Sequence, residues 1–307
     1  MFRKILLLTT VLVLTVTCNN PNNKRAVIDF DDNSINSPNS NKDLNNPKAI
    51  YIAIASMTSP KETFKHYSEL IEYISKKVGY PIFIKQKKTY EEVNILLENG
   101  EVDFAFICSG AFVEEYKKIK LLVAPEINNA TSYQAYIIAR KDSEIESFKD
   151  FKQHSFAFTD PLSNTGRLYP QKLVLEMNTN DADFFSNTIY TYGHDISIQM
   201  VNRGIIDGAS VHSLIFDYLT LHNPEKVENI KIVKKSQIFG NPPIVTPNSL
   251  SKEHFNNYQQ IFLNLHNDSI GRSILKKINI DQFVIVDEKI YRSVFQLKEF
   301  VKNEAGK

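Results

Sequence analysis

The sequence predicts an α/β fold made of two similar lobes with a cleft between them. From residue 49 onward, short apolar segments that fit strands alternate with amphipathic segments that fit helices. This alternation is typical of parallel sheets. The plan recurs further along the chain, since residues 99–112 resemble residues 203–216. A strand–helix plan that occurs twice indicates two related lobes.

The composition is that of an ordinary globular protein. The chain has 307 residues, of which 42% are hydrophobic and 23% are charged, and its net charge is +1. That length suits one large domain or two smaller ones. A charge balance so close to neutral gives no reason to expect a nucleic acid or another polyanion as a partner.

The first residues predict an export signal. Arg3 and Lys4 precede an apolar run at residues 5–16, which is too short to span a bilayer. The run ends at Cys18, and the segment resembles bacterial lipoprotein signals, in which such a cysteine is lipidated. Thr17 stands where Gly, Ala or Ser is usual. A plain secretory signal or an anchor helix therefore stays as the alternative.

Residues 19–47 predict a flexible tether. They are rich in Asn, Ser, Asp and Pro and contain few apolar residues, so they bury too little surface to fold. With Cys18 lipidated, Cys108 would be the one cysteine left, and no internal disulfide is expected. Cys108 lies in an apolar strand, where we interpret it as a small buried hydrophobic residue.

Five consecutive segments define the first lobe. Residues 49–55 and 81–86 fit strands, and residues 62–79 fit a helix with one apolar face. A second helix at residues 90–99 and a third strand at residues 102–108 follow.

When 104 is added to the residue numbers of this lobe, the same order of strands and helices recurs in the second half of the chain. The strand at residues 52–54 falls on residues 156–158, for example. The matched residues are Ser59 with Ser163, Tyr90 with His194, Gly100 with Gly204, Asp103 with Asp207, Ala105 with Ala209, Ser109 with Ser213 and Phe112 with Phe216. Segments that agree at one shift favour two related lobes, and the general likeness of βαβ units is the alternative explanation.

Six residues of the repeated plan are predicted to face the cleft. Ligands of open parallel sheets bind beyond the carboxyl ends of the strands. The six are Ser59, Ser109, Ser163 and Ser213, which follow predicted strands, and Tyr90 and His194, which precede predicted helices. Two facing lobes would present them to the same cleft from both sides.

The clearest binding motif is Ser-Asn-Thr-Gly at residues 163–166, where a strand turns into a helix. A helix start exposes unpaired N–H groups and the positive end of the helix dipole. Two hydroxyls and a side-chain amide add to them, and Gly166 lets the backbone approach closely. Together they form a socket for an oxyanion of phosphate type. Such a socket requires no lysine or arginine, although Arg167 is adjacent. Ordinary helix capping without a ligand is the alternative.

His194 is the second candidate, because it immediately precedes a predicted helix led by Asp195. A histidine there can donate a hydrogen bond to an anion, with Asp195 capping the helix or orienting the ring. Taken alone, a histidine at a helix start is more often a surface residue.

Together these motifs resemble the phosphonate-, phosphite- and phosphate-binding proteins of ABC importers, the PhnD-like family. The hallmark of that family is an Asp-Pro turn with hydroxyl residues and a glycine, matched at residues 158–166, followed by a Gly-His pair, matched at residues 193–194. Residues 206–209 and 242–245 fit in the same order. The resemblance covers residues 48–286.

The resemblance implies a type II periplasmic-binding-protein fold. In this α/β fold, each lobe is a mostly parallel sheet flanked by helices, and the ligand cleft lies between the lobes. Two crossings are expected near residues 136–141 and 242–246. The expected parts are a lipoprotein-type signal peptide at residues 1–18, a disordered tether at 19–47, lobe one at 48–139 plus 246–307, and lobe two at 140–245. The C-terminal helices, predicted from residue 251 onward, are expected to pack on lobe one.

The resemblance also implies the ligand and its contacts. The ligand would be a small phosphorus oxyanion, captured outside the cytoplasm for an ABC permease in the membrane. The residues carried over by position are Ser163, Asn164, Thr165 and His194 of lobe two, with Tyr90 and Tyr133 from lobe one or the crossing. To these the cleft argument adds Ser59 and Ser109.

Three departures from the family pattern are informative. Asn164 and Thr165 stand where hydroxyl residues are common, and the amide of Asn164 can still donate a hydrogen bond. Aminophosphonate binders place an aspartate before the Pro-Ile-Val segment, whereas residues 240–243 contain no acidic residue. An ammonium without a partner in a closed cleft would be costly. We therefore expect a ligand without an amine: phosphate, phosphite, a simple alkylphosphonate or another small oxyanion.

Two rival functions remain. The same lobe pair can present its ligand to a membrane histidine kinase. A hydrolase built on Ser163, His194 and Asp195 is disfavoured, because no Gly-x-Ser-x-Gly elbow surrounds the serine and the aspartate adjoins the histidine. The seven histidines show no metal-ligand spacing, so neither a metal nor another cofactor is expected. We expect binding rather than catalysis.

Overall fold

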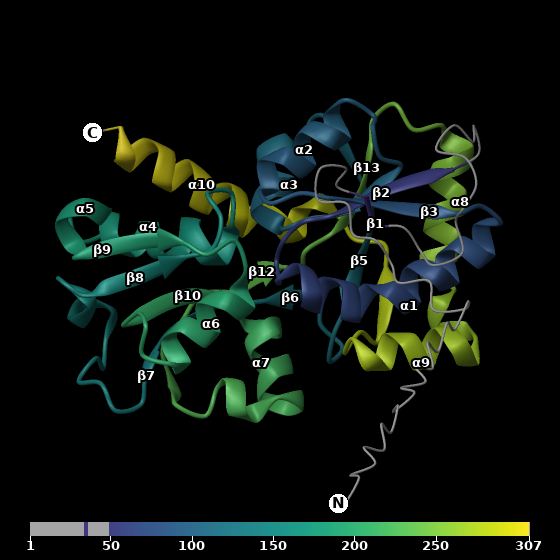
Figure 1. Ribbon diagram of the computed structural model, residues 1–307. Coiled ribbons are helices and arrows are strands. Elements are labelled where there is room, and N and C mark those ends of the chain that lie inside the picture. The colour runs from purple at the N-terminus through teal and green to yellow at the C-terminus, as the bar shows by residue number, and fades with distance from the viewer. Residues whose placement is uncertain (1–33, 36–48, 307) are drawn as a thin grey trace, which may run out of the picture.

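The computed structural model describes residues 34–35 and 49–306. It consists of two lobes, each built on one sheet (Figure 1). The sheet of lobe one has the strand order β1-β3-β2-β4-β13-β5-β14, and that of lobe two has the order β11-β7-β10-β8-β9. A two-stranded ribbon of β6 and β12 lies between them. Residues 1–33, which include Cys18, and most of the expected tether lie outside the described residues.

The strands of lobe one are β1 (Ser34–Ile35), β2 (Ile50–Ile54), β3 (Ile82–Gln86), β4 (Phe104–Phe106), β5 (Ile119–Glu126), β13 (Ile244–Pro247) and β14 (Gln282–Val284). Its helices are α1 (Pro60–Val78), α2 (Tyr90–Glu98), α3 (Ser109–Glu115), α8 (Lys252–Leu263) and α9 (Ser269–Lys277). In the described part of the chain, no helix combines the length and the apolar character that crossing a membrane requires.

The strands of lobe two are β7 (Ala135–Arg140), β8 (Ser155–Phe158), β9 (Asn187–Tyr190), β10 (Gly208–His212) and β11 (Ile230–Lys235). Its helices are α4 (Tyr169–Leu175), α5 (Asp181–Phe184), α6 (His194–Asn202) and α7 (Ser213–His222), and a π-helical turn, η2 (Asn164–Leu168), leads into α4. The ribbon consists of β6 (Ser132–Tyr133) and β12 (Phe239–Gly240), and the last helix is α10 (Arg292–Ala305).

Local sequence signals set the helix ends of lobe one. Pro60 opens α1 at a position where its missing N–H costs nothing, and Gly79 ends that helix in the left-handed conformation with a φ of 81°. Thr89 and Glu92 form a reciprocal capping box at the start of α2, which fixes Tyr90 as the first helical residue.

The predicted repeat is confirmed at the level of strand register. In lobe one Ala53 pairs with Ala105 on the parallel strands β2 and β4, and in lobe two Ala157 pairs with Ala209 on β8 and β10. The helices α2 and α6 begin and end at matched residues. The helix that precedes β4 in lobe one and the helix that precedes β10 in lobe two therefore start at matching positions in the two lobes.

A matched carboxylate stabilises each copy. Asp103 Oδ2 accepts a hydrogen bond from the backbone N–H of Tyr51 at 3.0 Å, and Asp207 Oδ2 accepts one from Ser155 at 2.8 Å. These bonds join the same two positions of the plan in each lobe. The aspartates matched in sequence are thus structural residues.

Each sheet is mixed rather than mostly parallel, which corrects the expectation. The parallel part consists of β3, β2 and β4 in lobe one and of β9, β8 and β10 in lobe two. The strands that follow a crossing between the lobes pair antiparallel with the parallel part of the sheet: β7 pairs with β10, and β13 pairs with β4. The reason is that these strands arrive from the opposite lobe, without the helical crossover that a parallel neighbour requires.

The lobe boundaries also differ from the expected ones. β7 belongs to the sheet of lobe two, so the outward crossing lies in β6, a few residues earlier than residue 140. β13 has already joined the sheet of lobe one at Ile244. Ser34 and Ile35, expected to belong to a disordered tether, pair with β3 as β1. An edge strand such as β3 offers unpaired backbone groups to such a segment.

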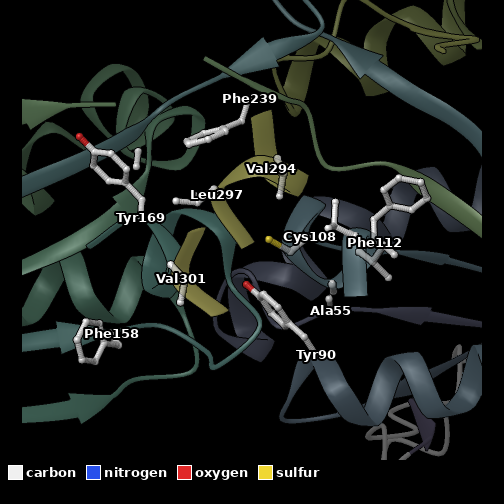
Figure 2. Close-up of a cluster of buried hydrophobic side chains, with 14 of the residues drawn as sticks. Ala55, Tyr90, Cys108, Phe112, Phe158, Tyr169, Phe239, Val294, Leu297 and Val301 are labelled. Atoms are coloured by element: carbon white, nitrogen blue, oxygen red, sulfur yellow. The ribbon is translucent and has the colours of Figure 1, made fainter. Parts of the chain in front are cut away.

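The last helix does not pack on lobe one alone, in contrast to the expectation for the C-terminal region. Figure 2 shows Leu297 and Val301 of α10 in the same buried cluster as Tyr169 of lobe two and Phe112 of lobe one. The Lys298 ammonium lies 2.8 Å from the Glu114 carboxylate of α3. α10 therefore packs against both lobes.

Gly208 tests the packing of lobe two. A Cβ at this position would lie 2.0 Å from the ring of Phe151, which is buried among other aromatic rings. We expect Gly208→Ala to lower the free energy of unfolding by about 1–3 kcal/mol, because the ring cannot move aside without displacing its neighbours. Urea denaturation measures the change.

The matched control is Gly306→Ala at the end of α10, where a Cβ meets no atom closer than 3.6 Å. An unfolding free energy of Gly208→Ala equal to that of the control would contradict the packing described for Phe151.

Candidate functional site

Four element starts from both lobes converge on one buried region. Tyr90 is the first residue of α2, Ser109 of α3 and His194 of α6, while Ser163 caps the turn η2. All four side chains are buried between the lobes. Helix starts carry unpaired N–H groups and the positive ends of the helix dipoles, so this region favours negative charge.

The turn at residues 163–166 has the predicted form. Ser163 Oγ accepts a hydrogen bond from the N–H of Gly166 at 3.0 Å. Gly166 is required there, since a Cβ would lie 2.1 Å from Thr159 Oγ1. Arg167 does not join the cluster, because it pairs with Asp181 at 2.7 Å. The turn is thus preformed and uncharged.

Tyr133 links the ribbon between the lobes to both sides of the cluster. Its hydroxyl shares a hydrogen bond of 2.7 Å with Ser109 Oγ and accepts one of 3.1 Å from Asn164 Nδ2. Burial raises the pKa of Tyr133 well above 10, so the phenol stays protonated. The expectation that Tyr133 comes from lobe one or the crossing agrees with its place in β6.

His194 is held in one tautomer. The backbone N–H of His212 donates to His194 Nδ1 at 3.2 Å, and Thr159 Oγ1 lies 3.1 Å from the same nitrogen. Because a backbone N–H can only donate, Nδ1 is the acceptor and the neutral ring carries its proton on Nε2. Burial lowers the pKa of His194 to about 3, so the ring is neutral near pH 7.

The polar cluster leaves several buried atoms without a hydrogen-bond partner among the described residues. They are Tyr90 OH, Asn164 Oδ1, Thr165 Oγ1 and His194 Nε2. Burying such groups unpaired costs free energy, and native proteins avoid it unless a ligand or water completes the bonds. Lobe one contributes one of these atoms and lobe two the others, so a partner for all of them would bridge the lobes.

Hydrogen bonds also join the two lobes directly. Asp160 Oδ2 of lobe two accepts from the N–H of Tyr90 at 3.1 Å, and Asp195 Oδ1 accepts from the N–H of Ser59 at 2.8 Å. The N–H of His194 donates to the carbonyl of Met57 at 2.9 Å. Two carboxylates of lobe two thereby cap the starts of two helices of lobe one.

The close approach of the lobes depends on a glycine. A Cβ at Gly110 of α3 would lie 2.2 Å from the carbonyl oxygen of Leu162 and 2.7 Å from the N of Asn164. Both are backbone atoms of lobe two, which cannot turn aside as a side chain can. Gly110 therefore permits this closed arrangement.

Two of the six residues predicted to face the cleft have other roles. Ser59 is only half-buried and bonds Asp195 through its backbone, with no side-chain capping bond. Ser213 Oγ accepts from the N–H of Gln134 in the outward crossing at 3.0 Å. Asp195 does not orient the ring of His194, because its Oδ1 engages Ser59 instead.

Sequence reasoning missed the residues that support the cluster. Thr159 and His212 hold His194, and Asp160 caps α2 across the cleft. A signal existed for His212, because the shift of 104 residues matches it with Cys108, the residue before Ser109. The described residues contain no group of three or more His, Cys, Asp or Glu side chains able to hold a metal ion.

Comparison with known proteins places this geometry in a family. The model of the family described as "ABC transporter, phosphonate, periplasmic substrate-binding protein" matches residues 52–291. The chain is 23% identical over 238 residues to the phosphonates-binding periplasmic protein of Escherichia coli, covering 75% of this chain and 70% of that protein. It is 24% identical over 230 residues to the phosphate-import protein PhnD of Mycolicibacterium smegmatis, covering 70% and 71%.

Solved structures share the fold. A binding-protein component of an ABC phosphonate transporter from Pseudomonas aeruginosa aligns with a TM-score of 0.79 at 23% identity, covering 84% of this chain and 87% of that one. PhnD1 from Prochlorococcus marinus in complex with methylphosphonate aligns with a TM-score of 0.74 at 16% identity, covering 84% and 99%. Because the family model spans well over half of the sequence, the chain belongs to the family of phosphonate periplasmic substrate-binding proteins of ABC transporters.

Proposed function

We propose that this protein captures a small phosphorus oxyanion without an amine outside the cytoplasm and delivers it to an ABC permease. Phosphate, phosphite and simple alkylphosphonates are the candidate ligands. The observation that carries the proposal is a set of buried polar atoms between the lobes, at the starts of helices, that have no hydrogen-bond partner among the described residues. The relatives support it, since one is named for phosphonates, one for phosphate import and one as a probable phosphite-binding protein.

The donors suit an anion with several oxygens. His194 Nε2 carries a proton, and the hydroxyls of Tyr90 and Thr165 can each donate one. A half turn of the Asn164 amide would present its Nδ2 to the ligand and let Oδ1 accept from Tyr133. All four groups are neutral, so the anion is bound by oriented dipoles in a region shielded from water, where hydrogen bonds are strong.

Capture would couple to closure of the lobes. A ligand that takes hydrogen bonds from Tyr90 and His194 interacts with both lobes only when they are close together. Such a ligand shifts the population toward the closed arrangement by its differential affinity. The closed arrangement is then the form that the permease would recognise.

A hydrolase on the same residues has less support. The proton-accepting nitrogen of His194 faces His212 and Thr159, and Ser163 Oγ is used within its own turn. Among the hydrogen bonds of the described residues, none joins Ser163 to His194. Binding explains the unpaired donors, whereas a catalytic triad does not.

Export and anchoring are part of the proposal. The basic and apolar start of the chain, followed by Cys18, supports a lipoprotein signal, and the polar residues between Cys18 and β1 support a tether. The protein would then stand off the outer face of the membrane, close to its permease.

His194→Ala tests the central donor. We expect binding of methylphosphonate or phosphate to weaken by about 1–3 kcal/mol, because a buried anion would lose one hydrogen-bond donor. Isothermal titration calorimetry measures the dissociation constant. The control is His254→Ala on α8, whose side chain is exposed. An unchanged dissociation constant for His194→Ala would remove this residue from the site.

Gly110→Ala tests closure without touching a donor. The added methyl group would meet the backbone of Leu162 and Asn164 only when the lobes are together. Since apparent affinity falls in proportion to the fraction of competent molecules, we expect binding to weaken at least about tenfold. The thermal unfolding of the variant without ligand should remain close to wild type. Wild-type affinity in Gly110→Ala would show that the bound form does not have this closed arrangement.

The absence of an amine is tested by comparing two ligands. Residues 240–243 offer no carboxylate to an ammonium, so we expect methylphosphonate to bind more tightly than aminoethylphosphonate. The carboxylate of Asp195 lies elsewhere in the cleft, and its Oδ2 has no hydrogen-bond partner among the described residues. Comparing the two ligands therefore also tests whether Asp195 pairs with the ammonium. Tighter binding of aminoethylphosphonate in calorimetry would refute the prediction.

A further inference from the structure

Thr159 directly follows β8 and reaches both parts of the anion cluster that lobe two contributes. Its side chain is fully buried. Its backbone N–H donates to the carbonyl of Gly166 at 3.2 Å, and its carbonyl accepts from the N–H of Tyr192 at 2.8 Å. Gly166 ends the Ser-Asn-Thr-Gly turn, and Tyr192 lies two residues before His194. The backbone of Thr159 therefore joins the turn to the segment that leads into α6.

The side chain of Thr159 contacts the same two parts. A Cβ at Gly166 would lie 2.1 Å from Thr159 Oγ1, so the backbone of the turn packs directly on this hydroxyl. The hydroxyl also lies 3.1 Å from His194 Nδ1. Because the backbone N–H of His212 donates to Nδ1, this nitrogen carries no proton, and the Thr159 hydroxyl must donate to it as well. Two donors thus point at one ring nitrogen.

Two donors at Nδ1 favour one state of the His194 ring. A proton on Nδ1 would face the N–H of His212, which cannot accept a hydrogen bond. The neutral ring therefore carries its proton on Nε2, the atom that has no partner among the described residues. Donation to Nδ1 also polarises the ring, which strengthens the hydrogen bond that Nε2 can donate. The other tautomer would present a lone pair to an anion and repel it.

The internal repeat supports a specific role for the Thr159 hydroxyl. The shift of 104 residues that matches His194 with Tyr90 matches Thr159 with Ala55. Ala55 is buried directly after β2, just as Thr159 is buried directly after β8. The phenol of Tyr90 has one polar atom and no tautomer to select, whereas an imidazole has two nitrogens. The hydroxyl is therefore present in the lobe whose donor is a histidine.

We propose that Thr159 is a positioning residue of the anion site, whose hydroxyl holds His194 in the tautomer that donates from Nε2 and whose backbone keeps the Ser-Asn-Thr-Gly turn beside that ring. The proposal rests on the proposed function of the cluster as an anion site. Thr159 acts through His194 rather than on the ligand, because its hydroxyl proton is used on the ring.

Thr159→Val tests the hydroxyl, since it keeps the shape of the side chain and the backbone bonds. We expect a second set of His194 ring signals, from the tautomer protonated on Nδ1, in ¹⁵N NMR spectra of the ligand-free variant. Binding of methylphosphonate in calorimetry should weaken about threefold to tenfold, as expected for one neutral hydrogen bond. Thr159→Ser keeps a hydroxyl and should restore both the single tautomer and the wild-type dissociation constant.

The matched control is Thr246→Val on β13, the same change at a buried threonine of lobe one whose hydroxyl has no partner among the described residues. It should alter neither the ring signals nor the affinity. The spectrum of His194→Ala identifies the signals that belong to this ring.

The ring signals and the affinity together decide the proposal. A wild-type ring protonated on Nδ1 would overturn it, whatever the variants do. It would also be overturned by unchanged ring signals in Thr159→Val, by wild-type affinity in that variant, or by a Thr159→Ser variant that restores neither property. Failure of the wild-type protein to bind methylphosphonate and phosphate would contradict the proposed function instead, and the ligand-free spectra would still show whether Thr159 sets the tautomer.

Discussion

The structure depends on side-chain hydrogen-bond donors that are buried between two lobes and have no partner among the described residues. Helix starts bring backbone N–H groups and dipoles to the interface, and side chains such as His194 and Tyr90 add donors there. Leaving such groups unpaired opposes closure, whereas an oxyanion that satisfies them favours it. Under the proposed function, the free-energy cost of these unpaired groups would give both selectivity for anions and coupling to the movement of the lobes.

The internal repeat explains how one plan provides both structural and binding positions. At the start of α1, the N–H of Ser59 is satisfied by the carboxylate of Asp195 from the other lobe. At the matched turn of lobe two, Ser163 caps the turn by itself, and the hydroxyl of Thr165 has no partner within the described chain. One turn is thus part of the contact between the lobes, and the other is the turn at which the proposed ligand would bind.

Much of the fold and the core of the site could be predicted because they depend on local sequence. The match of Tyr90 with His194 located the starts of α2 and α6, and the Ser-Asn-Thr-Gly motif located the capped turn after β8. Contacts between lobes could not be predicted, because Asp160 and Asp195 act on residues far away in the chain. The mixed sheets and the bridging position of α10 depend in the same way on long-range packing.

A crystal structure with methylphosphonate would show whether the buried donors between the lobes bind the anion. We expect phosphonate oxygens at hydrogen-bonding distance, about 2.7–3.1 Å, from His194 Nε2, from the Tyr90 hydroxyl and from Thr165 Oγ1, with Gly110 still against the backbone of lobe two. A phosphonate bound at any other place, with these three atoms making no contact to it, would contradict the account.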